Sequence, residues 1–182
     1  MGVLFVLTYF KLGPPHNILH STFYILHFYL LAALVILFVY DLRYGLVPDR
    51  VVLPAIGVAV LYTILSYRGF GSQFYILHFT FYIFSIAIGA GFFALQYYVS
   101  RGRWLGSGDI RIGALMGAML GWPLIGVGLV VSYIIGGVVA LGLIVARKKQ
   151  WGQTLPLGTF LTSGTVIVFV YGQQIWNWYW QI

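Results

Sequence analysis

Carboxylates are the side chains of this sequence best suited to chemistry, and there are only three of them: Asp41, Asp49 and Asp109. The chain has no Glu and no Cys, which excludes thiol nucleophiles and zinc–thiolate sites. Two carboxylates a few ångströms apart share one proton, because they cannot both ionise easily. Such a pair can activate water with its ionised member and protonate a leaving amine with the other, as in aspartic peptide hydrolysis.

Asp109 follows two glycines, Gly106 and Gly108, and begins an apolar stretch. Glycine allows close backbone approach and positive φ before a helix starts, so these glycines are expected to shape the turn. Asp109 is expected at or near the helix N-cap, where free N–H groups favour an anion. The alternative is a plain capping Asp after a flexible turn.

The elements that position these acids are expected to be membrane helices. The chain of 182 residues is 61% hydrophobic and 7% charged, whereas a soluble domain has about a quarter charged residues. The apolar runs are long and continuous, which favours helices over a barrel. We expect an all-α membrane protein with about six transmembrane helices, near 17–40, 51–67, 73–100, 109–121, 124–146 and 157–180.

Residues 1–16 are predicted to form a separate apolar or interfacial segment, and 17–182 a single polytopic membrane domain. The first ten residues lack a basic n-region and are too short to span, although a half-depth helix is an alternative.

Six spans would place eight basic residues on one side of the membrane, and Arg68 with Lys11 on the other. The eight are Arg43, Arg50, Arg101, Arg103, Arg111, Arg147, Lys148 and Lys149. The positive-inside rule makes the first side cytoplasmic, and the net charge of +7 is attributed to these loops rather than to nucleic-acid binding.

Asp41 would then end the first span and Asp109 begin the fourth, at one depth near the cytoplasmic face. This topology permits the two acids to meet. The alternative is two loop salt bridges, in which Asp41 pairs with Arg43 or Arg50, and Asp109 with Arg111 or Arg103.

The remaining polar and glycine positions have mainly structural interpretations. Asp49 follows Pro48 and is expected to cap the second helix; a third catalytic carboxylate or a metal site is the alternative, but no nearby His or Glu completes a ligand set. Pro156 and Gly158 predict a tight turn at the last helix start. Smooth packing faces are predicted from glycines at 113, 117, 121, 136, 137 and 142.

Three motifs, found in order over about 31–164, together resemble those of prepilin peptidases, which are GxGD-type intramembrane aspartic proteases. They are Tyr40-Asp41-Leu42-Arg43 with Val47-Pro48-Asp49, then Gly106-Ser107-Gly108-Asp109-Ile110-Arg111-Ile112 with Gly117 and Gly121, then Leu155-Pro156-Leu157-Gly158-Thr159-Phe160-Leu161 with Gly164.

This resemblance implies that Asp41 and Asp109 are the catalytic pair of a GxGD aspartic protease fold. It implies cleavage of the basic leader from type IV pilin-like or flagellin-like precursors with a hydrophobic helix, at the cytoplasmic face of the cell membrane and without metal or cofactor. The supporting residues it implies are Gly106, Gly108, Arg111, Pro48, Asp49, Pro156 and Gly158.

The sequence departs from the family pattern at several points. Arg111 stands where Lys is usual, and the Pro-Phe-Gly-Pro turn is Pro156-Leu157-Gly158-Thr159. The Cys-bearing insertion of many bacterial members is missing, so the chain resembles the minimal core of preflagellin or tight-adherence pilus peptidases, and methyltransferase activity is not expected.

Two other functions are weighed against the peptidase. A presenilin-like intramembrane protease shares Tyr40-Asp41 and Gly-x-Gly-Asp, but the chain is short for that group and its Pro-Ala-Leu turn is missing. A proton-coupled transporter would need carboxylates spread through membrane depth, whereas here they are predicted near one face.

Overall fold

The computed structural model describes residues 18–66, 72–146 and 155–180, which form six α-helices and, within these ranges, no strand. The all-α prediction is confirmed, while the segment predicted over 1–16 lies outside the described residues. The helices are α2 (Ile18–Tyr44), α3 (Asp49–Ser66), α4 (Ser72–Ser100), α5 (Ser107–Leu120), α6 (Leu124–Val145) and α7 (Leu157–Trp180).

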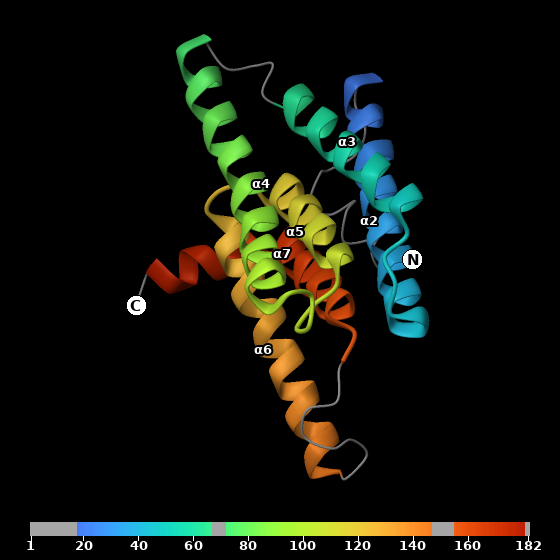
Figure 1. The fold of residues 1–182 in the computed structure, drawn as a ribbon. Helices are drawn as coiled ribbons and strands as arrows, with labels where there is room; N and C mark the ends of the chain where they lie inside the picture. Colours follow the sequence, from blue (N-terminus) through green and yellow to red (C-terminus); the bar gives the residue numbers. More distant parts are fainter. Residues whose placement is uncertain (1–17, 67–71, 147–154, 181–182) are drawn as a thin grey trace.

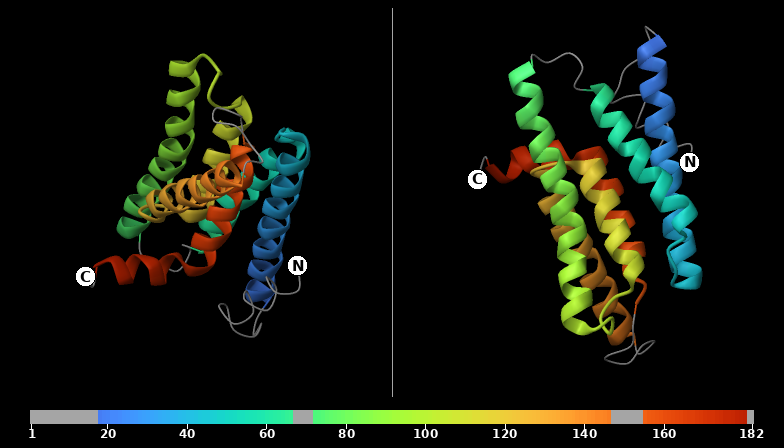
Figure 2. Two further views of the ribbon diagram at one scale, coloured as in Figure 1. Left: turned by 90° about the horizontal axis from the view of Figure 1, so that it is seen from below. Right: turned by 45° about the horizontal axis from the view of Figure 1, so that its top comes forward.

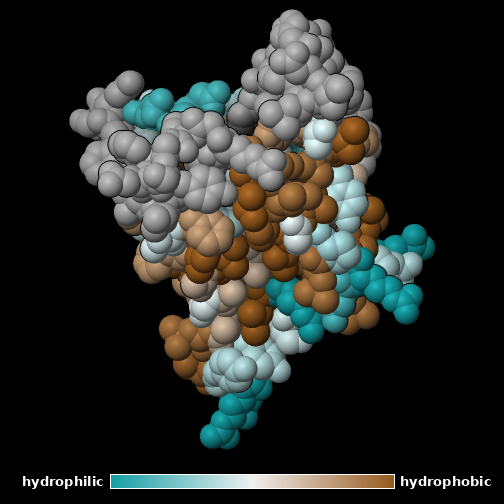
Figure 3. Space-filling model, turned by 90° about the horizontal axis from the view of Figure 1, so that it is seen from above, coloured by the Kyte–Doolittle hydropathy of each residue, from teal (hydrophilic) through white to brown (hydrophobic). Residues whose placement is uncertain are grey.

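Three of these helices, α2, α4 and α6, are long and apolar enough to cross a membrane, and hydrophobic residues cover much of the surface seen from above (Figure 3). Helix α5 has 14 residues, or about 21 Å, which is shorter than the roughly 30 Å hydrocarbon core. The structure therefore supports a helical membrane protein, and the six-span topology stays a prediction.

Helix α2 continues four residues beyond its predicted end at Tyr40, so Asp41 lies in its last turn and does not interrupt it. The helix ends at Gly45, whose N–H donates to the carbonyl of Asp41 (2.8 Å) and whose φ of +62° is readily adopted only by glycine. Because the helix continues past Asp41, this side chain projects from a helix rather than from a loop.

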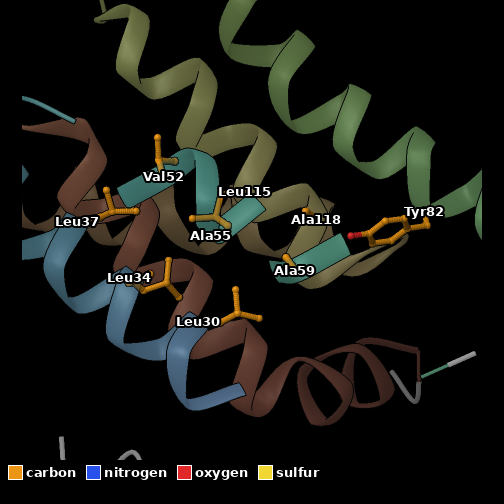
Figure 4. Packing of buried hydrophobic residues seen from close by; sticks show 10 residues of the cluster. Leu30, Leu34, Leu37, Val52, Ala55, Ala59, Tyr82, Leu115 and Ala118 are labelled. Atoms are coloured by element: carbon orange, nitrogen blue, oxygen red, sulfur yellow. The ribbon is translucent and has the colours of Figure 1, made fainter. Parts of the chain in front are cut away.

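The core lies where α2, α3 and α5 meet, with Tyr82 of α4 at its edge (Figure 4). Large side chains of α2, such as Leu34 and Leu37, face the small Ala55 and Ala59 of α3. All four are almost fully buried. Small residues on α3 let it lie close to α2. This packing fixes the orientation of α2 and therefore the position of Asp41 in its last turn.

Glycines allow α4 and α5 to pack with their backbones almost in contact. A Cβ on Gly89 would lie 2.1 Å from the carbonyl oxygen of Gly113, and one on Gly117 would lie 2.3 Å from that of Ser85. Ser85 also donates its hydroxyl to the carbonyl of Gly117 (2.9 Å). The predicted packing role is confirmed for Gly113 and Gly117.

The same prediction is wrong for Gly121, which is the C-cap of α5 with φ of +68° and has open space around it. In α6, Gly136 packs against Phe160, but Gly137 and Gly142 have no atom within 4 Å of an added Cβ. Spacing alone does not separate packing glycines from these others.

The ends of α2 and α4 and the starts of α5 and α7 gather at one end of the bundle (Figures 1 and 2). Segments that are far apart in the sequence therefore meet there, and they enclose the cavity that contains the acidic residues.

Candidate active site

A cavity of about 920 Å³ opens at this end of the bundle. Three stretches of chain, within residues 41–50, 102–111 and 155–157, line it. All three acidic residues of the chain lie on it, so the structure brings Asp41, Asp49 and Asp109 to one site. Asp41 and Asp109 are buried, with 5% and 7% of their surface exposed, whereas Asp49 is exposed.

Asp109 is held by the start of its own helix. Gly106 is the N-cap of α5, and its N–H donates to Oδ2 of Asp109 (3.0 Å), so the acid lies three residues after the cap. Neither glycine uses the positive φ that its type allows, because φ of Gly106 is −81° and Gly108 is not among the positive-φ glycines. The expected close approach is confirmed, since a Cβ on Gly108 would lie 2.7 Å from side-chain atoms of Val47.

The environment of Asp109 favours its protonated form. Burial raises the pKa of this carboxyl to about 6, the Gly106 N–H opposes the shift, and the negative charge of Asp41 adds to it. Asp109 lies outside the three helices long enough to span a membrane. Asp41, whose charge is the smallest of these contributions, lines the same cavity.

Asp41 is held by the start of α7. The N–H and the hydroxyl of Thr159 both donate to Oδ2 of Asp41, at 2.6 and 2.9 Å. Gly158 makes room for this contact, because a Cβ there would lie 2.9 Å from Oδ2 of Asp41. Pro156 lies just before α7 on the cavity wall, whereas Gly158, predicted to share a tight turn with it, is the second residue of the helix itself.

Thr159, which donates both hydrogen bonds to Asp41, was not identified as a site residue from the sequence motifs. It stands within the third motif, but no feature of the local sequence shows that its two donors point at a residue 118 positions away. A Thr directly after a glycine, in the first turn of a helix, was the available signal, since free N–H groups are found there.

Asp49 and Arg111, which both line the cavity, form an exposed ion pair. The alternative of a salt bridge between Asp109 and Arg111 is therefore wrong, because Arg111 pairs with Asp49. Arg43 lies over the ring of Tyr44 instead. Pro48 directly precedes α3, and its carbonyl accepts from the N–H groups of Val51 and Val52, the third and fourth helix residues (3.0 and 3.1 Å).

We predict that this exposed pair contributes little to stability. A double-mutant cycle with Asp49→Asn and Arg111→Gln is expected to give a coupling energy of about 0.2–1 kcal/mol that falls as salt is added. The measurement is thermal or denaturant unfolding in detergent. A coupling of several kcal/mol would show that the pair is shielded from solvent, contrary to this account.

A metal-based site finds no support among the described residues, which contain no group of three or more His, Asp or Glu side chains placed to hold an ion. The chemistry available to this cavity is that of two buried carboxyl groups and the donors that orient them.

Comparison with known proteins identifies the family of this chain. The profile of the type IV leader peptidase family matches residues 28–141, a region that includes all three acids. Prepilin leader peptidase/N-methyltransferase of Aeromonas salmonicida (strain A449) is 26% identical over 147 residues, covering 76% of this chain and 46% of that protein. Leader peptidase HopD of Escherichia coli is 30% identical over 140 residues, covering 74% of this chain and 84% of that protein.

The prepilin peptidase of Bacillus subtilis (strain 168) is 25% identical over 154 residues, covering 82% of this chain and 56% of that protein. The chain spans about half the length of the first relatives it matches. No solved structure matches it. Since the family profile covers more than half of the sequence, the chain belongs to the type IV leader peptidase family.

Proposed function

We propose that this chain is a membrane aspartic endopeptidase that cleaves the leader peptide of type IV pilin-like precursors. One observation carries the proposal: two buried carboxylates from distant parts of the chain line one cavity. Burial, with a smaller contribution from the charge of Asp41, raises the pKa of Asp109 there. Buried acids that interact in a cleft are typical of catalytic sites. The names of the related leader peptidases support a leader peptide as the substrate.

The hydrogen bonds suit a division of labour between the acids. Oδ2 of each Asp accepts the bonds described above, whereas Oδ1 of each receives none from the described residues. Donors directed at Asp41 stabilise a charged oxygen, and burial favours a proton on Asp109. Asp41 is therefore assigned as the base and Asp109 as the acid.

The reaction then follows the general aspartic scheme. Asp41 takes a proton from water while the water oxygen attacks the scissile carbonyl carbon, and Asp109 gives its proton to the carbonyl oxygen. When the tetrahedral intermediate collapses, the C–N bond breaks and the amine takes the proton from Asp41. The hydroxyl proton returns to Asp109, so each acid ends in its starting state.

We place the cavity at the cytoplasmic face of the membrane. The sequence argument is the excess of basic residues on that side. The exposed Trp104 and Leu46 line the cavity beside the exposed Arg50 and Arg103. A mixture of Trp, apolar and basic side chains suits the level of the lipid head groups. A precursor with a hydrophobic helix and a basic leader would be cut where it leaves the bilayer.

The location of all three acidic residues on one cavity favours a peptidase over a proton-coupled transporter. A transport path needs ionisable groups at several depths, whereas all three acids of this chain lie on one cavity. Processing of preflagellin uses the same chemistry on a related precursor, so it differs only in substrate.

Co-expression with candidate pilin and flagellin precursors tests the proposal. We expect a mobility shift of the precursor and a new N-terminus at the leader junction, found by mass spectrometry of the product. Intact precursors in every pairing, with the peptidase present in the membrane, would contradict the proposal. Ion flux in liposomes without proteolysis would favour a transporter instead.

We predict that cleavage slows as pH rises through about 6. The pKa of Asp109 is raised from 3.8 to about 6, so above this pH the group loses the proton that it must donate. The measurement is the pH dependence of kcat on a precursor in detergent. A rate that kept rising well beyond this pH would contradict the assignment of Asp109 as the acid.

A further inference from the structure

The first turn of α7 makes two hydrogen bonds to Asp41, and the proposed reaction scheme gives these bonds no role of their own. Thr159, the third residue of α7, gives both its N–H and its hydroxyl to the same oxygen, Oδ2 of Asp41. Both residues are buried. The contact joins the last turn of α2 to the first turn of α7, which lie at the same end of the bundle (Figure 1).

The backbone at this point is shaped to admit the carboxylate. Gly158 leaves space that any side chain would fill, since a Cβ would lie 2.9 Å from Cγ of Asp41 and 2.8 Å from Cδ1 of Ile112. The N–H groups of a first helical turn lack partners within their own helix, and the helix dipole favours negative charge there. Asp41 therefore supplies to α7 the acceptor that an N-cap side chain normally supplies.

The hydroxyl of Thr159 has a different kind of acceptor from the other Ser and Thr hydroxyls of α7. Thr162, Ser163 and Thr165 donate to carbonyls one turn earlier in α7 itself, at 2.7–3.0 Å. Among the Ser and Thr residues of α7, Thr159 is the one whose hydroxyl reaches another helix. Its hydrogen bond therefore orients a side chain of the site, whereas the others only satisfy local backbone.

We infer that Thr159 is a positioning residue for Asp41, an inference that rests on the proposed function. Two donors from one residue fix Oδ2 and so fix the rotation of the carboxylate, which leaves Oδ1 available to water and to the second acid. Without the hydroxyl, the carboxylate keeps the N–H contact but can rotate. Catalysis depends on a closely held geometry of its reacting groups, so kcat is the quantity that this contact controls.

The test compares substitutions of matched shape in detergent-solubilised enzyme with a pilin-type precursor. Thr159→Val replaces the hydroxyl by a methyl group, and Thr159→Ser keeps both donors. Thr165→Val is the matched control, because it removes a buried hydroxyl from the same helix that bonds only to the carbonyl of Leu161. Thr159→Ala removes the hydroxyl with less bulk and serves if the Val variant does not fold.

We expect Thr159→Val to lower kcat about ten- to a hundredfold with KM nearly unchanged, the scale of one lost hydrogen bond to a charged group. Thr159→Ser is expected to stay within a few-fold of the wild type, and so is Thr165→Val. Full kcat in folded Thr159→Val or Thr159→Ala would overturn the inference and leave the proposed function intact. Equal losses in Thr159→Val and Thr165→Val would also overturn it, because they indicate a structural role. A wild-type chain that cleaves no precursor would reject the proposed function and the inference with it.

Discussion

Asp41→Asn and Asp109→Asn are each expected to lower the rate of precursor cleavage by at least 10²–10⁴-fold, the usual contribution of a positioned acid or base. Asn has the shape of Asp but neither accepts nor donates a proton in the reaction. The two losses are not expected to multiply in the double variant, because the acids act as a unit. The measurement is the single-turnover rate on a purified precursor.

The third acid provides the comparison for this experiment. Asp49 lines the same cavity, but its carboxylate is exposed and pairs with Arg111, so Asp49→Asn is expected to cause a much smaller loss. Thermal unfolding of all the variants checks that they remain folded. Cleavage at the wild-type rate by either Asp41→Asn or Asp109→Asn would remove that residue from the mechanism.

Gly89→Ala is expected to destabilise the protein by about 2–3 kcal/mol, at the upper end for overpacking a close contact. The added Cβ would lie 2.1 Å from the carbonyl oxygen of Gly113 in α5, and this atom belongs to a backbone that has no rotamer to change. Helices α4 and α5 must therefore move apart. The measurement is the free energy of unfolding, or the shift in Tm, in one detergent.

Gly91→Ala is the matched control, two residues further along α4. No atom lies within 4 Å of its added Cβ, and Ala has the higher helix propensity by about 1 kcal/mol. This variant is therefore expected to be as stable as the wild type or slightly more stable. Similar destabilisation by both substitutions would show that helix α4 rather than its contact with α5 is the sensitive element.

The sequence predicts the helical class and most helix boundaries because apolar runs and Pro or Gly breaks are local features. It also predicts that Asp41 and Asp109 can meet, because only three acids exist and topology places two at one face. Their meeting in one cavity depends on how α2, α5 and α7 pack. That arrangement is a tertiary property which no single segment encodes.

The outcomes that the sequence does not predict are those that depend on neighbouring elements. The same glycine spacing gives a packing contact at Gly117 and a helix end at Gly121. The partner of Arg111 is Asp49 rather than the acid two residues before it. Thr159 gained its role only because Gly158 lets a carboxylate from α2 reach the helix start. The contact at Gly117, the ion pair of Arg111 and the hydrogen bonds of Thr159 each depend on a residue that is distant in the sequence.

The central claim, that Asp41 and Asp109 lie together on one cavity, can be tested directly because the chain has no Cys. In the double variant Asp41→Cys with Asp109→Cys, the two thiols are the only ones present, and a short thiol–thiol crosslinker applied in membranes reports their separation. The pair Asp49→Cys with Arg111→Cys, which replaces the exposed ion pair, is the positive control. We predict an intramolecular crosslink in both double variants. A crosslink in the control pair but none between positions 41 and 109, with both thiols reactive, would contradict the account.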